Sequence, residues 1–254
     1  MTLDDIGLAL AELGIARDAT VMVHADAGIA AQLRTLEPDD RLPMCVETLK
    51  AYFAEQGTLI VPSFTYSATQ GQDFDVAQTR SAVGQFSEVF RTSANVQRSA
   101  HPIFALSVYG RKVNQFLNAQ LTDCFGSGSA FDLLYQEDAT IVCLGCDVSR
   151  ITFVHYVEQA QAVSYRYMKS FQSRVIENGQ SVSGTVDYFV RDLDRNTGCD
   201  LEWLKAEAVK RGAMKSAPIG RFEALSIRTR DFFGVASDLL NSNPYALIAE
   251  RHAS

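Results

Sequence analysis

The sequence contains no run of about 18 or more apolar residues, the length that a transmembrane helix requires. Its first five residues are acidic and lack the basic stretch that opens a secretory signal peptide. Lys and Arg form no basic stripe, and the net charge is −7 with a pI of about 5.1. We therefore expect a protein that uses neither a membrane nor nucleic acid as its partner.

Cysteine is scarce and widely spread. Five cysteines are an odd number in a chain too large to need disulfides, which favours a reduced, cytoplasmic setting. Cys143 and Cys146 form a CxxC motif, but no second CxxC and no suitably spaced pair of histidines accompanies it. We expect no metal, and we expect Cys143, which lies inside an apolar run, to be a small buried hydrophobe.

The common nucleotide-binding fingerprints are also missing. Neither GxGxxG nor GxxxxGK[ST] occurs, and no serine stands in a G-x-S-x-G elbow. The loop at residues 125–129, Phe-Gly-Ser-Gly-Ser, resembles a phosphate cradle only weakly. These absences argue against Rossmann and P-loop folds, but well-placed local donors would still allow an acidic protein to bind an anionic coenzyme.

What the sequence does contain is an alternation of strand-like and helix-like segments. This alternation predicts an α/β fold, and the absence of a linker or repeat predicts one domain over residues 1–254. Strands are predicted at 20–24, 58–62, 104–109, 140–144 and 224–229. Helices are predicted at 2–13, 43–55 (opened by Pro43), 83–91, 131–136, from about 152, at 201–211 and from about 230.

Two segments depart from this alternation. Residues 63–82 have no clean period, and a loop of this length inside a compact domain is usually functional or mobile. Residues 173–177 and 180–184 flank Asn178-Gly179, the strongest short hairpin signal. An antiparallel hairpin at about 170–190 is therefore expected as an addition to the α/β body.

His155 is the first candidate for a general base. It follows the strand at 140–144 and begins a helix, which is where open α/β sheets place their ligand crevice. Imidazole also titrates near neutrality. Glu158, three residues on, shares its helical face and would orient the imidazole or hold a cationic amine. The alternatives are a structural histidine and an acidic first-turn residue favoured by the helix dipole.

Other polar residues also border predicted strands. Arg98, Ser99 and His101 precede a strand and suit phosphate oxygens, although a polar loop ended by proline is the simpler interpretation. His24 ends the first strand, and Tyr66 lies just beyond the second. These ends of strands are expected at the edge of the crevice.

Five segments stand in an order that resembles the aminoglycoside 3-N-acetyltransferase family. They are residues 23–24, 57–65, 98–102, 125–129 and 152–158. The resemblance implies a three-layer α/β/α sandwich with a central mixed sheet. It also implies acetyl-CoA, or another short acyl-CoA, as the donor and an amine on a sugar-like ring as the acceptor, and it leaves a homodimer open.

The resemblance also assigns roles to individual residues. It makes His155 the general base and places Glu158 at the acidic catalytic position. Contacts to the coenzyme are expected from His24, Asp26, Thr65, Arg98, Ser99 and His101. Contacts to the acceptor are expected from Tyr66, Asp75 and Asp192, the two carboxylates suiting a cationic amino sugar.

One departure from the family pattern concerns the coenzyme contact. The family usually has Val-His-Ser-Ser after the first strand, whereas residues 23–26 here are Val-His-Ala-Asp. The change suggests a shifted donor, an altered acyl preference or a non-catalytic CoA-binding homologue.

Residues 62–66, 74–76 and 165–169 are more similar to family members encoded with surface-polysaccharide genes than to the resistance enzymes. We therefore expect direct acetyl transfer to an amino sugar, nucleotide-linked and used in polysaccharide synthesis. An aminoglycoside 3-N-acetyltransferase and an O-acyltransferase are the enzymatic alternatives.

Overall fold

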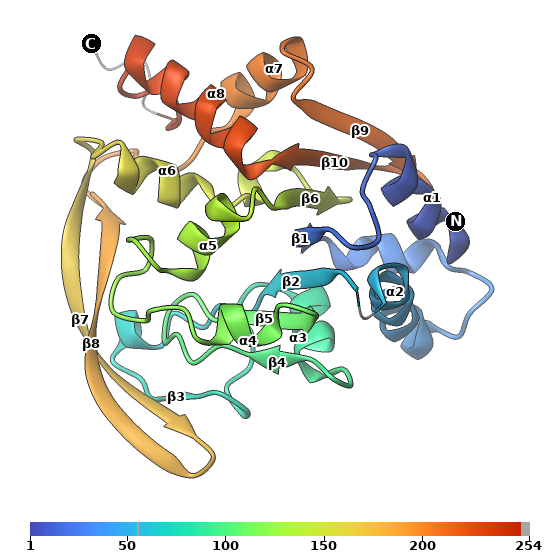
Figure 1. Ribbon diagram of the computed structural model, residues 1–254, viewed down its shortest axis with the longest axis horizontal. Coiled ribbons are helices and arrows are strands. Elements are labelled where there is room, and N and C mark those ends of the chain that lie inside the picture. Colours follow the sequence, from blue (N-terminus) through green and yellow to red (C-terminus); the bar gives the residue numbers. More distant parts are fainter. Residues whose placement is uncertain (55, 250–254) are drawn as a thin grey trace.

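The computed structural model, which describes residues 1–54 and 56–249, is built around a seven-stranded mixed sheet in the order β4-β5-β2-β1-β6-β10-β9 (Figure 1). Its strands are β1 Thr20–Ala25, β2 Thr58–Pro62, β4 Gln97–Arg98, β5 Leu106–Gly110, β6 Thr140–Leu144, β9 Met214–Ile219 and β10 Phe222–Arg228. The inner strands β2, β1 and β6 are parallel, whereas β5 and β10 pair with them antiparallel. The carboxyl ends of the three parallel strands therefore lie along one edge of the sheet.

Helices cover both faces of this sheet, as the alternating side chains of β1 require. Val21 and Val23 belong to one core, with α1 Asp4–Glu12, α2 Pro38–Phe53 and α3 Gln85–Thr92. Met22 points into the other core. That second core is closed by α4 Val113–Leu117, α5 Ala130–Gln136, α6 Val154–Ala160, α7 Glu202–Lys210 and α8 Thr229–Ser242. The predicted α/β/α sandwich is thus confirmed.

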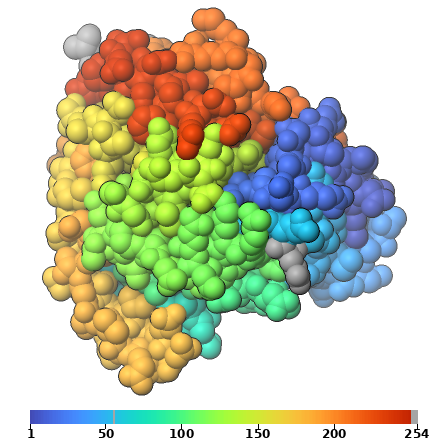
Figure 2. Space-filling view, viewed as in Figure 1, coloured from blue at the N-terminus to red at the C-terminus, as the bar shows by residue number. Residues whose placement is uncertain are grey.

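The predicted hairpin is present and longer than expected. Strands β7 Arg166–Glu177 and β8 Gln180–Arg191 pair along their whole length around Asn178-Gly179. The hairpin curves along one side of the body, and its tip extends beyond the rest of the molecule in the space-filling view (Figures 1 and 2). Part of the predicted 63–82 loop, β3 Phe74–Asp75, pairs with β7 to complete a three-stranded sheet.

Two expectations about local structure were wrong. Helix α2 begins at Pro38, with Asp39 and Asp40 in its first turn, so that Pro43 lies inside the helix instead of opening it. The predicted last residue of this helix, 55, lies outside the described residues. Strand β9 was missed because it contains Pro218, yet it is the edge strand of the sheet, where a missing N–H is tolerated.

Of the helices in the described part of the chain, none is long and apolar enough to cross a membrane.

Candidate active site

A cavity of about 610 Å³ opens at the carboxyl ends of β1, β2 and β6, where the ligand crevice was predicted. Its wall combines the segments that follow these strands with the start of α3 and the start of α6. The lining residues include His24, Asp26, Phe64, Tyr66, Gly84, Gln85, Ser87, Cys146, Ser149, Arg150, Thr152, His155 and Cys199.

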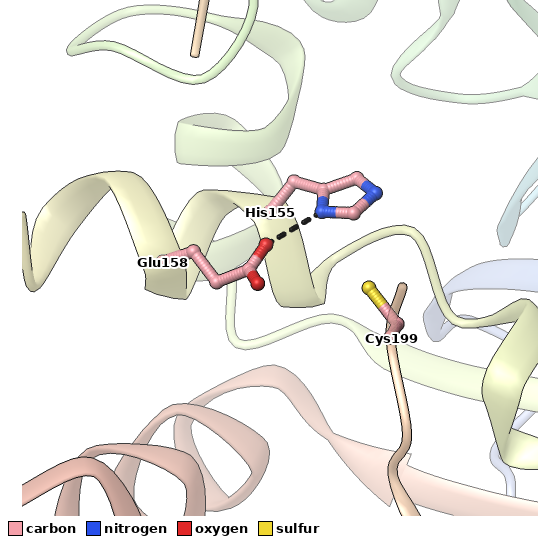
Figure 3. Close-up of side chains that lie close together, drawn as sticks. All are labelled: His155, Glu158 and Cys199. Atoms are coloured by element: carbon pink, nitrogen blue, oxygen red, sulfur yellow. Dashed lines mark hydrogen bonds and ion pairs between the residues drawn. The ribbon is translucent and has the colours of Figure 1, made fainter. Parts of the chain in front are cut away.

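His155 and Glu158 form a hydrogen-bonded pair on this wall. The 2.7 Å contact joins Nδ1 of His155 to Oε2 of Glu158, as the spacing on one helical face predicted. The two residues differ in burial, since the His155 side chain is 18% exposed and that of Glu158 is 0% exposed. Figure 3 shows the second ring nitrogen, Nε2, pointing away from the carboxylate.

Glu158 has two further partners that sequence reasoning missed. The hydroxyl of Tyr165 donates to Oε1 at 3.1 Å, and Nε of Arg166 lies 2.7 Å from Oε2. Both partners stand at the start of the long hairpin, eight residues or fewer after Glu158. No periodicity links a helix residue to side chains at the start of the following hairpin, so the sequence contains no signal for this pairing.

The protonation state of this pair follows from its surroundings. Burial lowers the pKa of His155, and the hydrogen bond with Glu158 offsets only part of this effect. Burial alone would raise the pKa of Glu158, but the His155 hydrogen bond and the charge of Arg166 outweigh it and leave that pKa lowered. A neutral imidazole beside a carboxylate donates Nδ1–H and keeps the lone pair of Nε2 as an acceptor.

Three more of the predicted residues lie on the cavity wall. His24 is buried at the end of β1, and burial lowers its pKa to about 4, so its ring is neutral. Asp26 caps the short helix η1 Ala27–Gln32, and its Oδ1 accepts a hydrogen bond from the N–H of Gly28 at 2.7 Å. Tyr66 has a φ of 57°, a strained left-handed conformation that is typical of functional sites.

Arg98 is not part of the cavity wall. Its guanidinium donates to the hydroxyl and carbonyl of Ser63 and to the carbonyls of Val76 and Thr79. These bonds fasten the segment after β3 to the end of β2. Thr65 is also buried, and its hydroxyl donates to the Pro102 carbonyl at 3.4 Å. Both side chains already bond to other groups of the protein. The coenzyme contacts expected of them stay predictions.

Ser99 and His101 line a separate space of about 10 Å³, which is the size of one water molecule. The Ser99 hydroxyl accepts a hydrogen bond from the N–H of Leu106 at 2.9 Å. Nδ1 of His101 accepts bonds from the N–H groups of Ile103 and Phe104 at 3.1 and 3.0 Å. Both side chains therefore order the turn before β5, and neither reaches the large cavity.

The two predicted acceptor carboxylates also lie outside the cavity wall. Oδ1 of Asp75 accepts hydrogen bonds from the N–H groups of Ala77 and Gln78. Oδ1 of Asp192 accepts one from the N–H of Asp194. Each carboxylate thus closes a local turn.

Cys199 joins the pair from the segment after the hairpin (Figure 3). A ring nitrogen of His155, a carboxylate oxygen of Glu158 and the sulfur of Cys199 all lie within 4.8 Å of one another. The cationic partner of this cluster is already Arg166, whose Nη2 donates towards the Cys199 sulfur at 3.8 Å. We therefore interpret the cluster as an ion-pair network centred on Glu158 and not as a metal centre.

A buried carboxylate that bonds a neutral histidine at the wall of a crevice, within an α/β/α sandwich, is an arrangement that general acid–base enzymes use. The sequence profile of aminoglycoside 3-N-acetyltransferase matches residues 22–241, and the chain belongs to this family. The family consists of acetyl-CoA-dependent acyltransferases.

The chain is 27% identical over 241 residues to aminoglycoside N(3)-acetyltransferase IV from Salmonella sp., covering 92% of this chain and 85% of the relative. Its fold matches that of a histidine-to-alanine mutant of AAC(3)-IVa in complex with apramycin, with a TM-score of 0.75 and 24% identity over 97% and 94% of the chains. It also matches AAC-IIIb bound to CoASH, with a TM-score of 0.80 and 18% identity over 95% and 97% of the chains.

Proposed function

We propose that this protein is an acetyl-CoA-dependent N-acetyltransferase that acts on the amine of an amino sugar, with His155 as its general base. The observation that carries this proposal is the hydrogen bond between Nδ1 of His155 and the buried Glu158. Family membership supports the acetyl-CoA donor. A cytoplasmic setting belongs to the same proposal.

The chemistry follows from the state of the pair. An ammonium ion must lose a proton before its nitrogen can attack the thioester, and the Nε2 lone pair of a neutral His155 accepts that proton. The amine nitrogen then bonds to the acetyl carbon, the bond from carbon to sulfur breaks, and the CoA thiolate takes a proton from the imidazolium. Glu158 stabilises the transient positive charge on His155, and proton transfer of this kind contributes about 10² to 10⁴ in rate.

The charges of the cavity favour an acceptor with few amines. Among the described residues that line it, there is one acidic side chain, Asp26, and one guanidinium, Arg150. An aminoglycoside carries several ammonium groups and would need several carboxylates, whereas Arg150 suits a phosphate. We therefore infer a nucleotide-linked amino sugar of surface-polysaccharide synthesis as the acceptor. The aminoglycosides named for the relatives are the second candidate.

The test measures release of free CoA from acetyl-CoA in the presence of nucleotide-linked amino sugars, free amino sugars and aminoglycosides. We expect the highest kcat/KM with a nucleotide-linked amino sugar, and a loss of at least ~10²-fold in kcat for His155→Ala. Cys146→Ala, which alters another residue of the cavity wall, is the matched control and is expected to keep most of the activity.

Different results would identify the alternatives. Turnover that is faster with aminoglycosides overturns the acceptor class, and an ester product identifies an O-acyltransferase. CoA binding in calorimetry without turnover on any acceptor identifies a non-catalytic homologue. Full activity of His155→Ala overturns the assignment of the base.

A further inference from the structure

Two side chains, the imidazole of His155 and the guanidinium of Arg166, share one oxygen of Glu158. Oε2 lies 2.7 Å from Nδ1 of His155 and 2.7 Å from Nε of Arg166. Tyr165 donates to the other oxygen, Oε1, at 3.1 Å. The side chains of Arg166 and Glu158 are 2% and 0% exposed, so water screens the interaction between them very little.

Arg166 is held in place independently of Glu158. It is the first residue of β7, and its Nη1 donates to the carbonyl of Phe189 on β8 at 3.3 Å. Its Nη2 lies 3.8 Å from the sulfur of Cys199. The hairpin therefore delivers a positive charge to the buried pair, and Arg166 is not among the residues that line the cavity.

We propose that Arg166 is a positioning residue for the base: by sharing the Glu158 carboxylate with His155, it keeps the imidazole free of a proton until the acceptor amine supplies one. The inference rests on the proposed function, because it takes His155 as the base. It gives the added hairpin a role in the site, because Arg166 is the first residue of β7.

The physical reason is competition for the carboxylate. A guanidinium is always charged, so a proton on His155 places a second positive charge beside the same oxygen. Burial lowers the pKa of His155 first of all, Glu158 opposes burial, and the charge of Arg166 lowers the pKa further. The titratable and charged groups that surround the pair are Tyr165 from the turn before β7, Arg166 from β7, Tyr188 and Arg191 from β8, and Cys199.

The experiment titrates His155 by NMR in protein labelled at histidine, and His155→Ala assigns its signal among the four histidines of the chain. Arg166→Gln is expected to raise the apparent pKa of the pair by about one unit or more. Arg166→Lys keeps the charge and is expected to stay near the wild-type value. Arg191→Gln is the matched control, because Arg191 is exposed and lies directly across the strand ladder from Arg166; we expect a shift below about 0.3 unit.

The pH dependence of kcat/KM supplies the second measurement. In Arg166→Gln the acidic limb should move to higher pH together with the NMR value, so that activity falls more at pH 6 than at pH 9. A merely structural role for Arg166 lowers activity equally at every pH and leaves the titration of His155 unmoved, which overturns the inference. An equal rise in Arg191→Gln overturns it too.

The remaining outcomes are also decisive. If Arg166→Gln does not fold, Arg166→Lys still tests the idea, because it keeps a positive charge beside Glu158 and must leave the titration of His155 near the wild-type value. A clear rise in Arg166→Lys contradicts the inference. If the expected NMR shift occurs but no acceptor is acetylated, the proposed function fails while the link between Arg166 and His155 stands.

Discussion

At the scale of single residues, the site depends on one carboxylate with no exposure to water. Glu158 accepts hydrogen bonds from His155 and Tyr165 and forms an ion pair with Arg166, which compensates its negative charge. A buried ion pair of this kind adds little stability over an apolar replacement, but it is costly to break on one side. We therefore expect the stability of the protein and the protonation state of His155 to depend on the same carboxylate.

Glu158→Gln tests this dependence. The change leaves Arg166 as a buried charge without a carboxylate, so we expect a loss of about 3–5 kcal/mol in the free energy of unfolding, measured by urea denaturation. It also removes the group that stabilises protonated His155, and kcat is expected to fall by about 10²-fold or more.

Glu207→Gln provides the comparison. Glu207 also bonds an arginine, Arg211, but on the surface of α7, where an ion pair contributes little. We expect the stability and activity of Glu207→Gln to stay at wild-type values. Equal effects of the two substitutions would show that burial of the Glu158 network has no special consequence.

The sequence predicted the half of this site that depends on local spacing. His155 and Glu158 lie three residues apart in one helix, and helical geometry alone brings their side chains together. Arg166 reaches Glu158 from a strand, and Arg98 reaches the backbone at Ser63 and Thr79, by contacts that only the tertiary fold creates. Arg98 therefore has the residue type of a phosphate ligand, but its guanidinium donates to the Ser63 hydroxyl and to backbone carbonyls.

At the scale of elements, the hairpin combines a local turn signal with strands that the sequence showed only in part. Asn178 and Gly179 have φ values of 51° and 76°, as a type I′ turn requires. The strands continue far beyond the predicted core of the hairpin because β3 and the body support β7 near both ends. The edge strand β9 was missed because its Pro218 indicates a break, although an edge strand tolerates the missing N–H. The early start of α2 was missed because proline is most common in the first turn of a helix, whereas Pro43 lies inside this one.

Gly179→Ala is expected to weaken the hairpin without affecting the site. An added Cβ would meet nothing within 4 Å, so the cost is that of the left-handed backbone alone, about 1 kcal/mol. Hydrogen exchange should show faster opening of the amides near the tip of β7 and β8, while kcat stays unchanged because Arg166 lies at the other end of the ladder.

Gly184→Ala is the control for this prediction. Gly184 lies in β8 without a positive φ, and its Cβ would meet only the Ser173 hydroxyl at 3.8 Å. We expect equal or slower exchange in this variant. Faster exchange in both variants, or in neither, would contradict the idea that the turn sets the stability of the tip.

At the scale of the whole molecule, the central sheet places neutral histidines inside the body of the protein. His24 at the end of β1 and His101 before β5 are both buried, and burial lowers the pKa of each to about 4. In the unfolded chain a histidine titrates near 6.5. The folded state therefore binds fewer protons than the unfolded state between these two values.

This difference predicts a loss of stability in mild acid. As the pH falls below about 6.5, these histidines become protonated in the unfolded chain but stay neutral in the folded protein. The free energy of unfolding therefore decreases until about pH 4. Each histidine contributes about 2–3 kcal/mol to the decrease between pH 7 and pH 4.5. The lowered pKa of Glu88, about 2, acts in another window, because its contribution is lost only below about pH 4.5.

His101→Asn separates this effect from general acid sensitivity. The Asn oxygen is able to accept the bonds from Ile103 and Phe104 that Nδ1 now accepts, but it does not titrate. Urea denaturation at pH 7 and at pH 4.5 should give a stability difference that is smaller in His101→Asn than in wild type by about 2–3 kcal/mol. If the variant and wild type lose the same free energy between these two pH values, His101 is already charged in the folded protein, and the acid sensitivity of this fold has another source.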